Sequence, residues 1–187
     1  SDKMQILKML TRLRQLCLEP RLVYDNIDQP SSKLKACMEL IKTMQENKQK
    51  VLLFSSFTSA LDLIAEECQK AGITYYMLTG STNKEERREL VSRFQKDDTT
   101  LFLISLKAGG TGLNLTSAEN VIHYDPWWNV SAQNQATDRA YRIGQKSNVQ
   151  VFNLVMKDSV EEKIIEMQKR KKELADMFVE NNSGGLS

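Results

Sequence analysis

Short apolar runs alternate with amphipathic segments from residue 49 onwards, and this alternation limits the possible folds most strongly. The runs are Val51–Ser55, Tyr75–Leu78, Leu101–Ser105, Val121–Tyr124 and Val149–Val155. Two parallel strands need a crossover connection, which a helix usually supplies. The pattern therefore predicts an α/β fold with a twisted, mainly parallel sheet of about five to seven strands and helices on both faces.

Segments with the apolar spacing of helices lie before, between and after these strands. Leucine and methionine recur every three residues from Met4 to Leu16, which predicts a first helix, and a second is expected to run to about Asn47. A long last helix is expected from Ser159. The expected N-caps are Ser31 or Ser32, Thr58 or Ser59, and Ser81 or Thr82. The predicted segments are 1–48, 49–158, 159–180 and a flexible tail at 181–187.

Composition adds limits on size and compartment. A chain of 187 residues with 41% hydrophobic content suits one compact domain. Cys17, Cys37 and Cys68 are odd in number and widely spaced, which favours reduced, packed thiols over disulfides. No apolar run reaches bilayer length and no leader pattern is visible, so an intracellular location, in cytoplasm, nucleoid or nucleus, is expected over secretion or membrane insertion.

A loop with three glycines follows the run Leu101–Ser105. The sequence KAGGTG lacks the GK[ST] ending of a P-loop. Glycine still lets backbone N–H groups approach an anion closely, and the Thr111 hydroxyl can bond a phosphate oxygen. The loop is therefore either a phosphate contact or simply a tight turn beside the sheet.

Three polar side chains are expected to line one side of a helix that begins near Ser131. Gln135, Arg139 and Arg142 are spaced at i, i+4 and i+7. A guanidinium fork suits a phosphate better than an ammonium does. In the alternative interpretation Asp138 pairs with Arg142, and both lie on the surface without a ligand.

Aromatic and hydroxyl groups follow the predicted strands. Trp127 and Trp128 come directly after one strand; one is expected in the core, and the other can stack on a base or enter a nucleic-acid groove. Small donors that can hold backbone phosphates follow two other strands, although each hydroxyl can equally cap a helix. These are Ser55, Ser56 and Thr58, next to Phe57, and Thr79, Gly80 and Ser81.

Five segments together resemble one known family. LTRLRQLCLEPRL, VLLFSSFTSALDLI, YYMLTGSTNKEERRELVSRFQ, the stretch from Leu101 to Gln145, and VFNLVMKDSVEEKI are similar, in order, to the C-terminal RecA-like lobe of Swi/Snf-type, helicase-related ATPases of superfamily 2. QATDRAYRIGQ after DPWWN is highly specific to that family. Tyr141 departs from the family's usual histidine, which puts any proton or hydrogen-bond role there in doubt.

The resemblance implies a three-layer RecA-like lobe at 49–158 and a C-terminal helix that braces two lobes. It also implies that Arg139 and Arg142 act as arginine fingers on a triphosphate, with Gln135 beside them. The loop from Gly110 to Asn114 would lie between the nucleotide and the DNA backbone. The residues that the resemblance places at the nucleotide are Gln135, Gly110, Gly112 and Asn114.

The same resemblance implies a set of residues that contact nucleic acid. One strand's phosphates would be held by the residues after two strands, and an aromatic side chain would touch the duplex groove. These residues are Ser55, Phe57, Thr79, Gly80, Ser81, Thr111, Trp127 and Trp128.

The sequence lacks a GxxxxGK[ST] motif and an acidic DExH-like tetrad, which the family carries in its first lobe. Phosphoryl transfer needs that phosphate cradle and its metal as well as the arginines. We therefore expect no metal site here, ATP and Mg²⁺ held mainly by a first lobe of the same protein, double-stranded DNA as partner, and little activity from this chain alone. A non-catalytic nucleic-acid-binding or protein-docking module, and a helicase that unwinds RNA or single strands, are the alternatives.

Overall fold

The structure is a computed structural model. It describes residues 3–9, 11, 31–108, 113–126, 149–156 and 159–183, and side chains of the last helix as far as Met177. The predicted site residues Gly110, Thr111 and Gly112, and those from Trp127 to Arg142, lie outside these residues.

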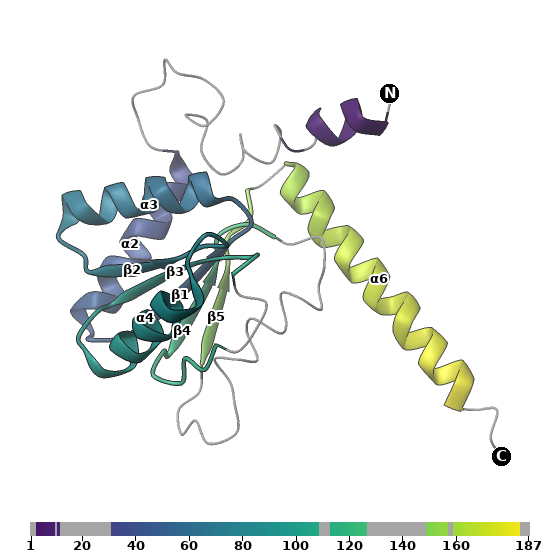
Figure 1. Cartoon of the computed structure of the whole chain (residues 1–187). Coiled ribbons are helices and arrows are strands. Elements are labelled where there is room, and N and C mark those ends of the chain that lie inside the picture. Colours follow the sequence, from purple (N-terminus) through teal and green to yellow (C-terminus); the bar gives the residue numbers. More distant parts are fainter. Residues whose placement is uncertain are drawn as a thin grey trace.

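Five parallel strands form one sheet in the order β2-β3-β1-β4-β5 (Figure 1). Their bounds are β1 Val51–Ser55, β2 Tyr75–Leu78, β3 Leu101–Ser105, β4 Asn120–His123 and β5 Gln150–Asn153. The three central strands are buried along their whole length, which explains why each reads as an unbroken apolar run. The predicted parallel α/β sheet is confirmed, and β5 is shorter than the predicted Val149–Val155.

Helices cover both faces of the sheet and make a three-layer lobe (Figure 1). Helices α2, Ser32–Glu46, and α3, Thr58–Ala71, pack on one face, and α4, Lys84–Lys96, packs on the other. Alternate residues of β1 point to opposite faces, so Leu53 joins the core under α2 and α3, and Phe54 joins the core under α4. The RecA-like architecture is thus confirmed.

Two of the three cysteines belong to the core. Cys37 of α2 and Cys68 of α3 are free thiols with no exposed surface. Burial raises the pKa of the Cys68 thiol to about 12 and also raises that of Cys37, so both stay protonated. Their predicted role as small hydrophobic side chains is confirmed.

The helix N-caps differ from the expectation at two of three places. Ser31 caps α2 as predicted, through a bond from the Leu34 N–H. Helix α4 is capped by Asn83 instead of Ser81 or Thr82, because those hydroxyls take part in the preceding turn. Helix α3 begins after Phe57, which has no capping side chain, so neither Thr58 nor Ser59 caps it.

The ends of the chain carry exposed apolar side chains. The last helix, α6, spans Val160–Ser183, and its first turns bury Glu161 and Ile164 against the lobe. Met167 and Leu174 are 50% and 67% exposed further along. Residues 3–9 are helical, with Met4 exposed. A contact of α6 with a second lobe, as a brace, stays a prediction.

Candidate nucleotide and nucleic-acid interface

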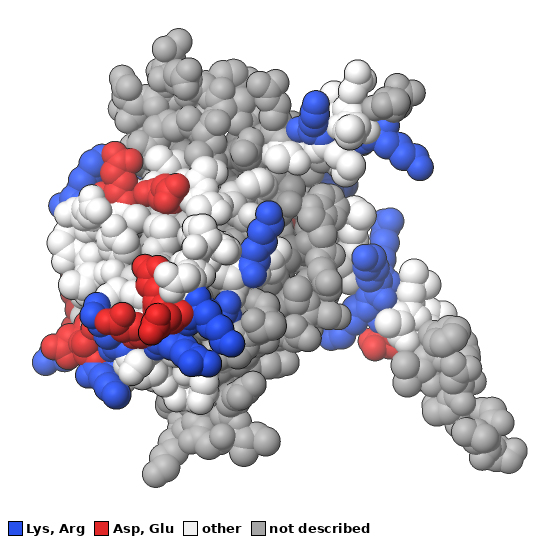
Figure 2. Space-filling view, in the orientation of Figure 1, with Lys and Arg blue, Asp and Glu red and all other residues white. Residues whose placement is uncertain are grey.

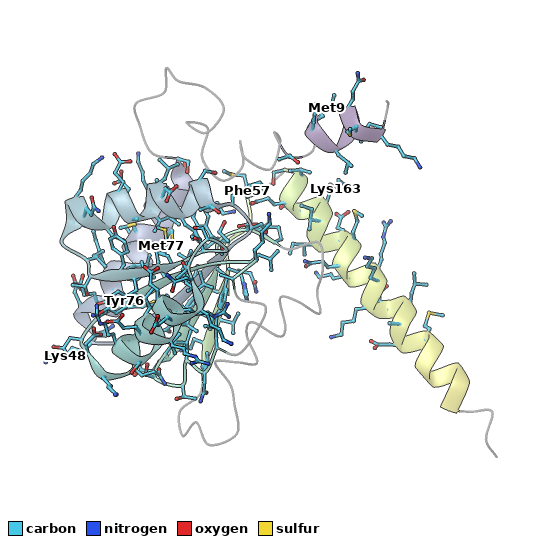
Figure 3. The ribbon with its side chains drawn as sticks, in the orientation of Figure 1. Met9, Lys48, Phe57, Tyr76, Met77 and Lys163 are labelled. Atoms are coloured by element: carbon cyan, nitrogen blue, oxygen red, sulfur yellow. The ribbon has the colours of Figure 1, made fainter. Side chains whose placement is uncertain are left out.

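The carboxyl ends of the parallel strands meet at one edge of the sheet, which we call the carboxyl edge. The chain passes from β1 out to β2, returns to β3, and continues on the other side of β1 as β4. Ligands of such sheets bind outside this edge, where the strand order reverses. In Figure 3, Phe57 lies at the end of the sheet from which α6 departs and Lys48 at the opposite end.

Several described site residues lie at the ends of strands at this edge. Ser55 is the last residue of β1 and Phe57 follows it, the turn at Thr79 follows β2, and Asn114 lies in the connection between β3 and β4. Asn114, Gly80 and Ser81 are exposed, and Thr79 and Phe57 are partly exposed. The structure therefore places the described site residues after β1 and β2 at one edge of the sheet, and Asn114 in the connection between β3 and β4.

Ser55 is held inward by a buried carboxylate. Its hydroxyl donates to Oδ1 of Asp125 at 2.6 Å, and the Ser56 N–H donates to the same oxygen at 3.1 Å. The Phe57 N–H donates in turn to the Ser55 hydroxyl oxygen at 3.1 Å. Ser55 is 0% exposed and Asp125 is 1% exposed. The buried Ser55 side chain therefore fixes the loop, and its contact with a phosphate stays a prediction.

Sequence reasoning missed Asp125. The residue lies directly before Pro126, at the exit of β4 that leads to Trp127 and Trp128. An acidic residue that follows a buried strand at a ligand edge was the available signal. Its partners at the end of β1 and directly after it are 70 and 69 positions away along the chain, and no local pattern indicates such a pairing.

The turn after β2 is organised by its own hydroxyls. The Thr79 N–H donates to Oγ1 of Thr82 at 3.1 Å, and the hydroxyls of Thr79 and Ser81 lie 2.9 Å apart. A Cβ atom added to Gly80 would lie 3.6 Å from Cβ of Lys107, which is ordinary contact. Lys107, which sequence reasoning did not single out, therefore places an exposed cation beside this turn.

A buried ion pair anchors α6 at the same edge. The Lys33 ammonium lies 2.7 Å from both carboxylate oxygens of Glu161, and the two side chains are 4% and 1% exposed. The Met156 N–H donates to Glu161 at 2.8 Å, and the ammonium also lies 5.1 Å from the ring centre of Tyr124. Helices α2 and α6 are thus joined next to the exit of β4.

His123, the only histidine in the chain, is the last residue of β4 and is 1% exposed. Its ring stacks on Phe54 at 5.7 Å between centroids. Burial lowers the pKa of this imidazole from 6.5 to about 4, so His123 is neutral at physiological pH.

The described residues at this edge carry hydroxyl groups and backbone N–H groups. The Asn114 side-chain amide can donate and accept, as nucleotide groups require. The described residues contain no group of three or more histidine, cysteine or acidic side chains that could hold a metal ion.

Within the same residues, no helix combines the length and hydropathy of a membrane span.

The helicase conserved C-terminal domain family matches residues 32–144. A putative ATP-dependent helicase/translocase of Bacillus subtilis is 40% identical over 97% of this chain. SWI/SNF-related matrix-associated actin-dependent regulator of chromatin subfamily A member 1 of Mus musculus is 37% identical over 96% of this chain. The chain spans 20% and 18% of those two proteins, so the relatives are much longer.

Solved structures show the same arrangement. A structure titled Sulfolobus solfataricus SWI2/SNF2 ATPase C-terminal domain superimposes with a TM-score of 0.73 at 30% identity, over 89% of this chain and 69% of that chain. The C-terminal part of the Fun30 ATPase domain gives a TM-score of 0.70 at 40% identity, over 73% of this chain and 45% of that chain.

Proposed function

Since the chain belongs to the helicase conserved C-terminal domain family and is a C-terminal RecA-like lobe of Swi/Snf type, we propose that it is the second motor lobe of an ATP-dependent translocase on double-stranded DNA. One observation supports this most: the loops after β1, β2 and β3 and the exit of β4 all meet at the carboxyl edge. That edge is where sheets of this kind bind their ligands.

Contacts with the nucleotide are assigned to the motif QATDRAYRIGQ and to the connection after β3. Arg139 and Arg142 act as arginine fingers, with Gln135 beside them, and Gly110, Gly112 and Asn114 face the nucleotide from the connection after β3. ATP with Mg²⁺ supplies the phosphoryl group whose hydrolysis drives movement. The first lobe of the same protein holds most of it, because this sequence has no P-loop and no acidic tetrad.

DNA contact is assigned to the loops at the carboxyl edge. Thr79, Gly80 and Ser81 hold phosphates of one strand with hydroxyl and backbone donors, and Phe57 contributes from the neighbouring loop. Ser55 shapes that loop through Asp125. Thr111 approaches the backbone from the glycine loop, and Trp127 or Trp128 touches the groove.

The test compares this chain alone with a protein in which it is joined to its first lobe. We expect duplex DNA to stimulate ATP hydrolysis only in the two-lobe protein, since the chain alone lacks half of the site. Clear hydrolysis by the chain alone would refute the half-site assignment. A two-lobe protein that binds DNA without hydrolysing ATP would favour a non-catalytic module, and strand displacement would favour an unwinding helicase.

A further inference from the structure

Helix α4 separates its charges along two sides. Lys84, Arg87 and Arg88 occupy positions i, i+3 and i+4, which lie on one side of a helix. Glu85 and Glu89 are rotated away from them, together with Glu86. Figure 2 shows basic and acidic side chains next to one another on the surface around α4. Within α4, which the structure describes in full, no ion pair joins Lys84 or Arg88 to a carboxylate.

A groove of about 630 Å³ runs along this basic side. Its volume lies within the roughly 300–1,000 Å³ typical of ligand clefts. The three cations Lys84, Arg87 and Arg88 line it. Among the described residues, the hydroxyl groups of Thr82 and Ser92 and the apolar side chains of Val91 and Leu113 also line it. Cations and hydroxyls above an apolar floor suit a sugar-phosphate chain.

Two of the three cations have no competing partner. Lys84 and Arg88 are exposed, and neither forms an ion pair with any residue in the described part of the chain. Arg93 on the same helix instead contacts the carboxylate of Glu89. An anion that enters the groove therefore gains two cations without breaking an existing pair.

The groove continues from the turn that we assign to the DNA backbone. Thr82 lines the groove and also accepts the hydrogen bond of the Thr79 N–H inside that turn. Lys107 lies beside the turn, since a Cβ atom added to Gly80 would be 3.6 Å from its Cβ atom. A basic path thus extends from Lys107, past the turn, to Lys84 and Arg88.

We propose that this groove binds the sugar-phosphate backbone of the same DNA duplex beyond the Thr79–Ser81 turn, with Lys84 and Arg88 each neutralising a phosphate. The inference rests on the proposed DNA-translocase function and adds a second stretch of the DNA path. Continuity with the turn favours DNA over an acidic protein segment as the occupant. Contacts of this kind give affinity and register without reading sequence.

The test measures duplex binding by the two-lobe protein across a salt series, from about 50 to about 200 mM. The variants are Lys84→Ala, Arg88→Ala and the double substitution, with Arg93→Ala as the matched control. Each phosphate contact contributes about 0.9 to the slope of log affinity against log salt. We expect the slope to fall by about one in each single variant and about two in the double variant, and to stay unchanged in Arg93→Ala.

Measurements of ATP hydrolysis distinguish a failure of this inference from a failure of the proposed function. In the double variant the DNA concentration that gives half-maximal stimulation should rise, while the rate without DNA and the maximal rate stay unchanged. If the unmodified protein binds DNA but the variants show the same salt slope as it does, the groove assignment alone is overturned. An acidic protein segment is then the alternative occupant. If the unmodified protein neither binds duplex nor responds to it, both proposals fail.

Discussion

The hydroxyl of Ser55 donates a hydrogen bond of 2.6 Å to Oδ1 of Asp125, a residue 70 positions later in the chain. Both residues are buried, and the bond joins the loop after β1 to the exit of β4. In the proposed motor, the first segment contacts DNA and the second leads towards Arg139 and Arg142. The same carboxylate therefore connects the two segments whose movements a translocase has to coordinate.

Replacement of Asp125 by alanine should destabilise the lobe. The change leaves the Ser55 hydroxyl and the Ser56 N–H without this acceptor at a buried site. An orphaned buried donor costs roughly 1–3 kcal/mol. We expect the free energy of unfolding in urea to fall by about 2–4 kcal/mol. Asp62→Ala, at an exposed position of α3, should change it by less than about 0.5 kcal/mol, and equal effects would contradict the assigned role.

Removal of only one partner of the ion pair between Lys33 and Glu161 should strongly lower the free energy of unfolding. Lys33→Met leaves a buried carboxylate without its cation, which typically costs about 3–5 kcal/mol. Adding Glu161→Gln removes that charge and keeps an acceptor for the Met156 N–H, so much of the stability should return. Urea unfolding of the single and double variants measures this coupling.

Lys163 and Glu166 supply the control for that experiment. They pair on the same helix at 3.6 Å, but their side chains are 74% and 56% exposed (Figure 3 labels Lys163). Exposed pairs contribute about 0–1 kcal/mol. Lys163→Met should therefore hardly change stability, and a cost similar to that of Lys33→Met would show that burial is not the cause.

Stability should depend on the protonation of His123. The unfolded imidazole titrates near pH 6.5, while burial lowers its pKa in the folded lobe to about 4. Between these values only the unfolded state binds the proton, so stability is lost as the pH falls from about 6.5 to about 4, and this loss stops below about 4. The total is on the order of 3 kcal/mol.

His123→Gln isolates this contribution from that of the carboxylates. Urea unfolding of both proteins across this pH range should show that the difference in unfolding free energy between them changes by that amount. A difference that stays constant with pH would mean that His123 does not titrate as its burial implies.

Sequence patterns predicted those parts of the fold that depend on local burial. β1, β2 and β3 begin and end where their apolar runs do, since a parallel strand covered on both faces tolerates few polar residues. The caps were less predictable, because several neighbouring residues can each supply the needed oxygen. Asn83 caps α4 only because Ser81 and Thr82 are engaged in the turn before it.

Long-range polar pairs were not predictable. Lys33 and Glu161 are 128 positions apart, and nothing near either residue indicates a buried partner. Likewise, the sequence placed Ser55 at the ligand edge correctly but not the direction of its hydroxyl, which Asp125 decides. The groove along α4 depends on which side of the helix the core covers, and therefore on the packing of Phe94 against the sheet.

The central claim is that Arg142 completes a nucleotide site shared between two lobes. The most direct measurement is DNA-stimulated ATP hydrolysis by the two-lobe protein with Arg142→Ala, with Arg93→Ala as a control that removes an arginine outside the proposed site. An arginine finger contributes about 10³- to 10⁵-fold to the rate. We predict a loss of that order in Arg142→Ala with DNA binding and thermal stability retained; hydrolysis at the unmodified rate would contradict the claim.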